Sequence, residues 1–293
     1  MAAFGRLLTA MVTPFDSNLE VDYRQAAALA QNLVANGSDG LVVAGSTGEA
    51  ATLSFEEKCK LFATVLEAVG DRATVIAGTG SNDTSTARKL TREAEKIGVH
   101  GAMVVGPYYN KPPQEGLFQH FKAISEETAL PLIVYNVPGR TASNILPATV
   151  LRLAEFKNIA AIKEASGSLD QVSEIVRNAP ADFVVYSGDD SLTLPMLAIG
   201  GHGVISVAAH LAGREMHAMI DAFLAGDTAA AKALHLRLMP FFKIMFVTTN
   251  PIPVKEAVNL SGFNAGGLRP PLIGATQEEL AKITKVMKEF DLQ

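Results

Sequence analysis

The sequence predicts an α/β fold, a (β/α)8 TIM barrel followed by a C-terminal helical domain. Three observations support this fold class. The chain has 293 residues, and a barrel of this type needs about 250. Eight short runs rich in Val, Ile, Leu and Ala alternate with segments of helical periodicity. After the eighth run the pattern is helical only.

The eight β-type runs occur in order along the chain, each of them short and apolar. They cover residues 7–12, 41–44, 74–77, 102–105, 132–135, 159–163, 183–187 and 204–207. Helical segments between consecutive runs indicate right-handed βαβ units and therefore a parallel sheet, and eight such units close a barrel.

The helical segments carry recognisable ends. The first follows Asp22 as a cap and closes at Gly37. The second begins with a capping box, Ser54 with Glu57 three residues later, and ends at Gly70. An open doubly wound sheet is the alternative fold, but no GxGxxG turn follows the first run.

The end of the chain predicts a helical appendage. Helices are expected over residues 215–224, 228–247, 254–260 and 277–288, with a Gly/Pro-rich stretch before the last. The expected division is a catalytic barrel over 1–224 and a helical domain over 225–293.

Composition excludes several classes of function. The net charge is -5, aromatic residues make up 6% and Trp is absent, so a nucleic-acid partner has no basic, aromatic surface to bind. No apolar stretch is long enough for a membrane span, and the amino-terminal residues lack a basic leader, so we expect no membrane partner and a cytoplasmic location. Cys59 is the single cysteine and cannot form an intrachain disulfide. The six histidines show no HxH or HExxH spacing, so no metal site is expected.

The candidate chemistry lies after the strands, because active sites of such barrels form at the carboxyl ends of the strands. Lys163 emerges from the apolar run 159–162, and a period of two places it on one face with Ala161 and Ile159. If that face is the barrel interior, desolvation lowers the pKa of the lysine, and the neutral amine can attack a ketone. The alternative is a surface lysine that closes a strand.

Neighbouring strand ends supply the other groups that Schiff-base chemistry needs. Tyr135, at the end of the preceding run, can reach Lys163 across the interstrand spacing of about 5 Å and exchange protons with it. The run Gly45-Ser46-Thr47-Gly48 offers backbone N–H groups and two hydroxyls to a carboxylate. Arg140 could bind a second carboxylate. A core tyrosine and a solvated loop arginine are the alternatives for Tyr135 and Arg140.

Taken together, the strand-end motifs resemble those of the dihydrodipicolinate synthase family, within the superfamily of N-acetylneuraminate lyases and class I pyruvate aldolases. The resemblance extends from the first run to residue 255 and rests on GSTGE at 45–49, GPYYNKPPQEG at 106–116, YNVPGR at 135–140, IKEASG at 162–167, SGDD at 187–190, GGHGVISV at 200–207 and NPIPVK at 250–255. The resemblance implies a (β/α)8 barrel with a C-terminal helical domain, assembled as a homotetramer of two tight dimers.

The resemblance also implies catalytic roles. Lys163 would form an imine with pyruvate, and Tyr135 would shuttle protons during imine formation and aldol addition. Ser46 and Tyr109 would complete a hydroxyl relay. Ser46 departs from the threonine common in the synthases and matches the neuraminate lyases, but it keeps the hydroxyl.

Other positions would bind the substrates or the partner subunit. Thr47 would hold the pyruvate carboxylate, and Arg140 the carboxylate of L-aspartate 4-semialdehyde. Gly188 and Ile205 would line the pocket, and Tyr108 would cross the dimer interface.

The expected reaction is a Schiff-base condensation of pyruvate with L-aspartate 4-semialdehyde to 4-hydroxy-tetrahydrodipicolinate, at the entry to diaminopimelate and lysine biosynthesis. No cofactor is expected, because the protonated imine serves as the electron sink. One alternative is a sugar-acid aldolase of the N-acetylneuraminate or 2-keto-3-deoxygluconate type, against which Arg140 argues. Another is a non-catalytic keto-acid-binding barrel, against which the proton relay argues.

Feedback inhibition by lysine is not expected. In family members that bind lysine, the resemblance places Tyr108, Asn82 and the turn at residues 50–51 at that site, together with histidines and a glutamate. Here Phe55, Lys58 and Thr86 occupy those last positions, so the ligand ammonium would lose its counter-ion and meet a like charge.

Overall fold

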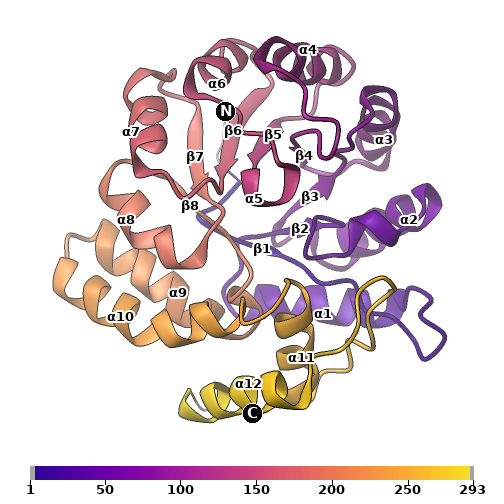
Figure 1. The fold of residues 1–293 in the computed structure, drawn as a ribbon, viewed down its shortest axis with the longest axis vertical. Helices are drawn as coiled ribbons and strands as arrows, with labels where there is room; N and C mark the ends of the chain where they lie inside the picture. Colours follow the sequence, from indigo (N-terminus) through magenta and orange to yellow (C-terminus); the bar gives the residue numbers. More distant parts are fainter. Residues whose placement is uncertain (1–3, 291–293) are drawn as a thin grey trace.

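The computed structural model describes residues 4–290 and confirms the predicted barrel. Eight parallel strands close in sequence order, β1 to β8, with the helices packed around them (Figure 1). The open-sheet alternative is excluded by the closure of β1 onto β8. The strands are β1 Leu7–Ala10, β2 Gly40–Val43, β3 Thr74–Gly78, β4 Gly101–Val105, β5 Leu132–Asn136, β6 Ile159–Glu164, β7 Val184–Ser187 and β8 Gly203–Ser206.

The helices of the barrel follow their strands. They are α1 Tyr23–Ala35, α2 Phe55–Val69, α3 Thr84–Ile97, α4 Gln114–Ser125, α5 Pro138–Thr141, α6 Pro147–Leu153, α7 Leu169–Asn178, α8 Thr193–Ala198 and α9 Ala209–Leu224, with short 3-10 turns η1 Ala50–Thr52 and η2 Asp190–Leu192. The expected caps are confirmed: Asp22 accepts from the N–H of Gln25, and Ser54 with Glu57 forms the capping box of α2.

One barrel helix begins earlier than expected. The prediction of a start at residue 215 is wrong, because α9 starts at Ala209, whose N–H donates to Ser206 Oγ at 2.8 Å. The backbone then leaves helical geometry at Ala212, with φ -105° and ψ 28°, before the regular part of the helix. The kink hides the first turn from a search for helical periodicity.

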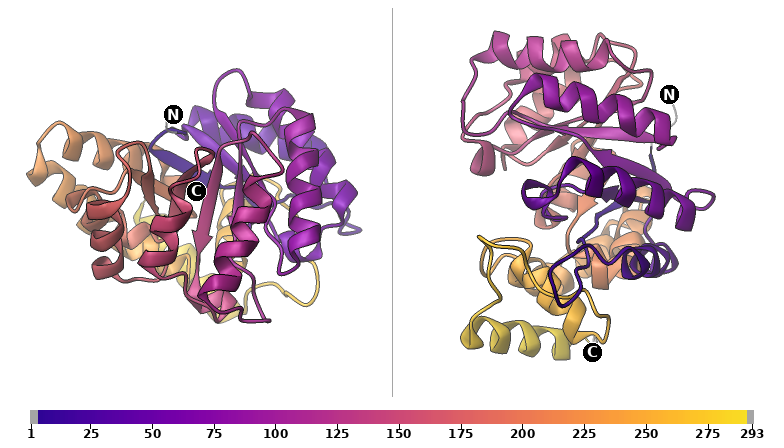
Figure 2. Two further views of the ribbon diagram at one scale, coloured as in Figure 1. Left: turned by 90° about the horizontal axis from the view of Figure 1, so that it is seen from above. Right: turned by 90° about the vertical axis from the view of Figure 1, so that its right-hand side faces the viewer.

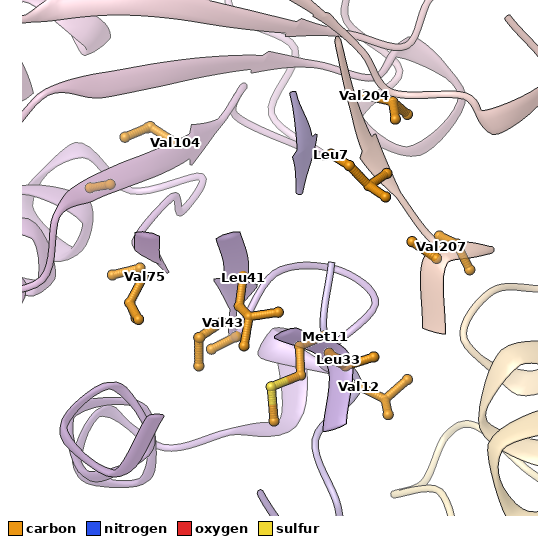
Figure 3. Close-up of a cluster of buried hydrophobic side chains, with 14 of the residues drawn as sticks. Leu7, Met11, Val12, Leu33, Leu41, Val43, Val75, Val104, Val204 and Val207 are labelled. Carbon is orange, nitrogen blue, oxygen red and sulfur yellow. The ribbon is translucent and has the colours of Figure 1, made fainter. Parts of the chain in front are cut away.

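Two apolar layers separate the inside of the barrel from its outside. Leu7, Leu41, Val75 and Val204 belong to the outer layer between strands and helices (Figure 3). The inner layer is small and fills the barrel interior; it comprises Phe4, Leu8, Ala10, Val42, Ile76, Met103, Ile133, Tyr135, Val137, Ala160, Ala161, Tyr186 and Ile205. The strands are therefore buried on both faces, as expected for an all-parallel sheet.

Strand β6 does not alternate as expected. Leu132 pairs with Ile159 but Ile133 pairs with Ala161, so β6 holds one extra residue at this point. Ile159 consequently belongs to the outer layer and Ala161 to the inner one. The expectation that Ile159 shares the face of Lys163 is wrong, while the pairing beyond Ala161 is regular up to Glu164.

The C-terminal region is helical, as expected. It contains α10 Thr228–Ile244, α11 Ile252–Leu260 and α12 Gln277–Glu289. Helix α10 packs against α9, and α11 and α12 lie together on one side of the barrel (Figure 2). Phe241, Val254 and Ile283 join the same apolar cluster as the outer barrel layer. The division at residue 225 falls at the end of α9 and stays an interpretation.

The helices formed by residues 4–290 include none with the length and apolarity that crossing a membrane requires.

Candidate active site

A cavity of about 320 Å³ opens at the carboxyl ends of β2 to β5. Four of the predicted site residues line it: Ser46, Tyr108, Tyr135 and Arg140. The segment 249–251, between α10 and α11 of the C-terminal region, forms another part of the wall. The cavity therefore lies where a barrel of this class places its chemistry.

Lys163 lies next to this cavity rather than in its lining. Its side chain is buried, and Nζ is 4.5 Å from the centroid of the Tyr135 ring. Burial lowers the pKa of Lys163 to about 8, an effect that the charge of Asp190 partly offsets and that of Arg140 reinforces. A substantial fraction of neutral amine is thus present near neutral pH, which nucleophilic attack on a carbonyl requires.

Tyr135 is the direct neighbour of Lys163 in the sheet. The two residues are paired in the β5–β6 register, and Tyr135 contacts both the cavity and the amine. Burial raises the pKa of Tyr135 to about 12. The phenol therefore keeps its proton at neutral pH and can donate it to a substrate oxygen.

Gly188 lies against the side chain of Lys163. A Cβ atom at Gly188 would lie 2.6 Å from Ala165 Cβ and 3.1 Å from Lys163 Cε. A side chain at this position would clash with Ala165 and crowd the end of the Lys163 side chain, so the glycine leaves room for both. Ile205 is buried in the inner layer of the barrel.

The loop after β2 holds Ser46 and Thr47. Ser46 lines the cavity, whereas Thr47 is buried, and its Oγ1 accepts a hydrogen bond from Asn250 Nδ2 at 3.0 Å. Glu49 ends the loop with a left-handed backbone, φ 55°, and its Oε1 accepts from Lys255 Nζ at 2.8 Å. The loop is therefore fastened to the C-terminal region at two points.

Arg140 lies in the short helix α5, which Pro138 begins. Its side chain is exposed on the cavity wall, and Nη2 donates to the main-chain oxygen of Asn250 at 2.9 Å. The guanidinium keeps other donors for a ligand, because arginine carries five N–H groups.

The two tyrosines after β4 occupy different places. Tyr108 lines the cavity of its own chain, while Tyr109 is 88% exposed and does not contribute to the lining. Tyr109 also has a positive φ of 75°, an uncommon conformation for a bulky residue. Within one chain, Tyr109 therefore does not line the cavity with Ser46 and Tyr135, the other hydroxyl groups of the expected relay.

Several buried polar residues received no role in the sequence analysis. Asp190 Oδ2 accepts from the N–H groups of Val207 and Ala208, at 3.1 and 2.9 Å, and burial raises the pKa of Asp190. Asn250, Lys255 and Glu49 form the ties between the β2 loop and the C-terminal region. The motifs SGDD and NPIPVK contain three of these four residues, so the resemblance could have identified them.

Residues 4–290 contain no group of three or more His, Cys, Asp or Glu side chains arranged to hold a metal ion. The expectation of a reaction without cofactor remains a prediction.

Comparison with known proteins shows to which family the chain belongs. The Dihydrodipicolinate synthetase family matches residues 3–290. The 4-hydroxy-tetrahydrodipicolinate synthases of Moorella thermoacetica and Nostoc sp. are 60% and 56% identical, over 99% of both chains and 100% of both chains respectively. Among solved structures, the dihydrodipicolinate synthase DapA-2 of Bacillus anthracis has 47% identity and a TM-score of 0.96, covering 98% of this chain and 99% of that one. The enzyme from Cyanidioschyzon merolae, solved with lysine bound, has 46% identity and a TM-score of 0.98, covering 99% of each chain. With its barrel, its buried strand-end lysine and these relatives, the chain belongs to the dihydrodipicolinate synthetase family.

Proposed function

We propose that this enzyme condenses pyruvate with L-aspartate 4-semialdehyde to 4-hydroxy-tetrahydrodipicolinate through a Schiff base on Lys163. Family membership supports the reaction. The observation that carries the mechanism is the buried amine of Lys163, which lies over the ring of Tyr135 and has its pKa lowered to about 8.

The first half of the reaction attaches pyruvate. The neutral amine of Lys163 adds to the keto carbon, and loss of water from the carbinolamine gives the imine. Tyr135 delivers the proton that leaves with the water and recovers one from the methyl group as the enamine forms. Ser46, on the same cavity wall, supplies a further hydroxyl to this relay.

The second half forms the carbon–carbon bond. The enamine carbon attacks the aldehyde carbon of the semialdehyde, whose oxygen takes up a proton from the relay. The amino group of the second substrate then attacks the imine carbon, which closes the ring and releases Lys163. Protonated imine and enamine accept and return the electron pair, so the cycle is redox-neutral.

The two substrates carry separate carboxylates, for which the cavity offers separate groups. The β2 loop, with Ser46 and Thr47, would bind the pyruvate carboxylate through its N–H groups and hydroxyls. Arg140, which also lines the cavity, would bind the carboxylate of the semialdehyde. Gly188 and Ile205 shape the space around the adduct.

The assembly is part of the proposal. Tyr109 would serve the relay from a second copy of the chain, because its side chain is 88% exposed and does not line the cavity of its own chain. We therefore expect the homotetramer of two tight dimers, with Tyr108 at the dimer interface and the cytoplasm as location. Sedimentation would give the mass of the assembly, and mixing Lys163→Ala with Tyr109→Phe subunits should restore activity in mixed dimers.

The alternative functions are not favoured. An aldolase for N-acetylneuraminate or 2-keto-3-deoxygluconate would present a polyol to Arg140, whose charge suits a carboxylate better. A non-catalytic keto-acid-binding barrel would not need the buried lysine and tyrosine, and the curated relatives are named as enzymes.

Borohydride trapping tests the mechanism. Sodium borohydride added with pyruvate should reduce the imine to a stable secondary amine on Lys163, identified by mass spectrometry of the peptide, and should abolish activity. Lys163→Arg should give no adduct, whereas replacement of the exposed Lys285 should change nothing. An enzyme that keeps full activity with an unmodified Lys163 would contradict the proposal.

A further inference from the structure

Asn250 lies between the two groups that the proposed function assigns to the two substrate carboxylates. Its side-chain Nδ2 donates to Thr47 Oγ1 at 3.0 Å, and its main-chain oxygen accepts from Arg140 Nη2 at 2.9 Å. Asn250 is 5% exposed and itself lines the cavity. One residue of the C-terminal region therefore contacts both binding groups of the barrel.

The direction of the bond to Thr47 has a chemical consequence. A threonine hydroxyl has one proton to donate and can also accept. Because Asn250 donates to Oγ1, the hydroxyl proton of Thr47 stays free for another acceptor, and a carboxylate oxygen is such an acceptor. The amide thus polarises Thr47 as a donor toward an anion.

Asn250 is itself held in place by its surroundings. Five residues further along, Lys255 in α11 binds Glu49 at 2.8 Å, and both side chains are 1% exposed. The N–H of Arg269 donates to the other oxygen of Glu49 at 3.0 Å. The segment that carries Asn250 is therefore tied to the same loop that carries Thr47, so the position of the amide relative to the hydroxyl is fixed.

We infer that Asn250 is a positioning residue for substrate binding, which orients the Thr47 hydroxyl toward the pyruvate carboxylate and fixes the guanidinium of Arg140. This inference rests on the proposed function. It gives the C-terminal helical region a direct part in the active site: the region completes the carboxylate-binding groups of the barrel. Asn250 Oδ1 is buried without a hydrogen-bond partner among the described residues, so the side chain is tied to the barrel through Nδ2.

Two substitutions at residue 250 distinguish loss of the hydrogen bond to Thr47 from reversal of its donor and acceptor. Asn250→Ala removes the donor, and the pyruvate concentration for half-maximal borohydride trapping should rise about tenfold, as expected for one lost hydrogen bond to a group that binds a charged ligand. Asn250→Asp keeps the shape but accepts the Thr47 proton and adds a negative charge, so the rise should be larger, about a hundredfold.

Asn259 provides a matched control. It lies further along the same C-terminal region, in α11, and its side-chain amide makes two hydrogen bonds, to Gly266 O at 3.0 Å and from Ala265 N at 2.7 Å, both within that region. Asn259→Ala should lower the melting temperature but leave pyruvate trapping unchanged. An equal change in trapping from Asn259→Ala would show a merely structural effect and overturn the inference.

A double-substitution cycle tests the route through Thr47. If Asn250 acts through the hydroxyl, Asn250→Ala should have little further effect on pyruvate trapping in a Thr47→Val background. Full additivity of the two effects would overturn the inference, as would wild-type trapping by Asn250→Ala. Failure of the proposed function looks different: the wild-type enzyme itself would then trap no pyruvate on Lys163.

Discussion

Lys255 and Glu49 form a fully buried ion pair that joins α11 to the loop after β2, with Nζ 2.8 Å from Oε1 and both side chains 1% exposed. The ammonium also lies 4.0 Å from the centroid of the Phe15 ring. The pair links residues distant in the sequence. Because both side chains are buried, neither charge can be solvated by bulk water if its partner is removed.

Removing one member of this pair should destabilise the enzyme strongly. Lys255→Met leaves the carboxylate of Glu49 buried with less compensation, which should lower the free energy of unfolding by about 3–5 kcal/mol. Urea denaturation followed by circular dichroism would measure the loss. The double variant Lys255→Met with Glu49→Gln should recover part of it, and a single variant as stable as the wild type would contradict the structure at this point.

The lowered pKa of Lys163 predicts the pH dependence of adduct formation. Only the neutral amine attacks pyruvate, so the rate of imine formation should rise with pH and reach half its maximum near pH 8. Stopped-flow or rapid borohydride quenching would give the profile. The charge of Asp190 raises the pKa of Lys163, so Asp190→Asn should move the midpoint to lower pH. A midpoint above pH 10 in the wild type would mean that the amine is solvated.

The separation of the two carboxylate groups predicts a selective defect for Arg140→Ala. Use of L-aspartate 4-semialdehyde should fall by about 1.5–3 kcal/mol in kcat/KM, the range for a hydrogen bond to a charged group. Trapping of pyruvate on Lys163 should persist. Steady-state kinetics with each substrate varied gives both values. Arg140→Lys keeps the charge but not the planar fork, so its kcat/KM for the semialdehyde should lie between those of the wild type and Arg140→Ala. Unchanged kinetics in Arg140→Ala would favour the sugar-acid aldolase.

The surroundings of Lys58 predict insensitivity to lysine. Lys58 lines the same cavity wall as Ala50, Ala51 and Tyr108, where its charge would oppose the ammonium of a bound lysine. Glu57 cannot compensate, because both its oxygens bind Arg269, at 2.9 and 2.6 Å.

An initial-rate assay with lysine titrated at saturating pyruvate tests this prediction. Half-maximal inhibition below about 1 mM, a binding free energy near -4 kcal/mol, would show that lysine is recognised in spite of Lys58. Combining Lys58→His with Thr86→Glu should introduce or strengthen inhibition.

The sequence was sufficient for the fold because its signals are local. Eight apolar runs with helices between them fix a parallel barrel, and the caps at Asp22 and Ser54 mark helix starts within a few residues. The pairing of Tyr135 with Lys163 followed from the same signals, since consecutive parallel strands lie side by side.

The parts that the sequence did not predict depend on contacts between distant residues. Thr47 and Asn250 are 203 positions apart, and nothing in the periodicity around either residue indicates the other. The sequence around Asp190 is typical of an exposed polar turn. In the structure its carboxylate is buried and accepts hydrogen bonds from the N–H groups of Val207 and Ala208, which lie on another strand end. The exposure of Tyr109 depends on the backbone conformation of its turn, which the composition of that turn does not reveal.

The extra residue in β6 has a consequence for the tolerance of the enzyme to change. Residues before the irregularity, such as Ile159, face the helices, while the segment from Ala161 to Lys163 keeps strict pairing with β5. Without the extra residue, the pairing that starts at Leu132 and Ile159 would place Ile162 opposite Tyr135 and turn Lys163 to the other face of the sheet. The enzyme should therefore not tolerate deletion of a residue from this end of β6.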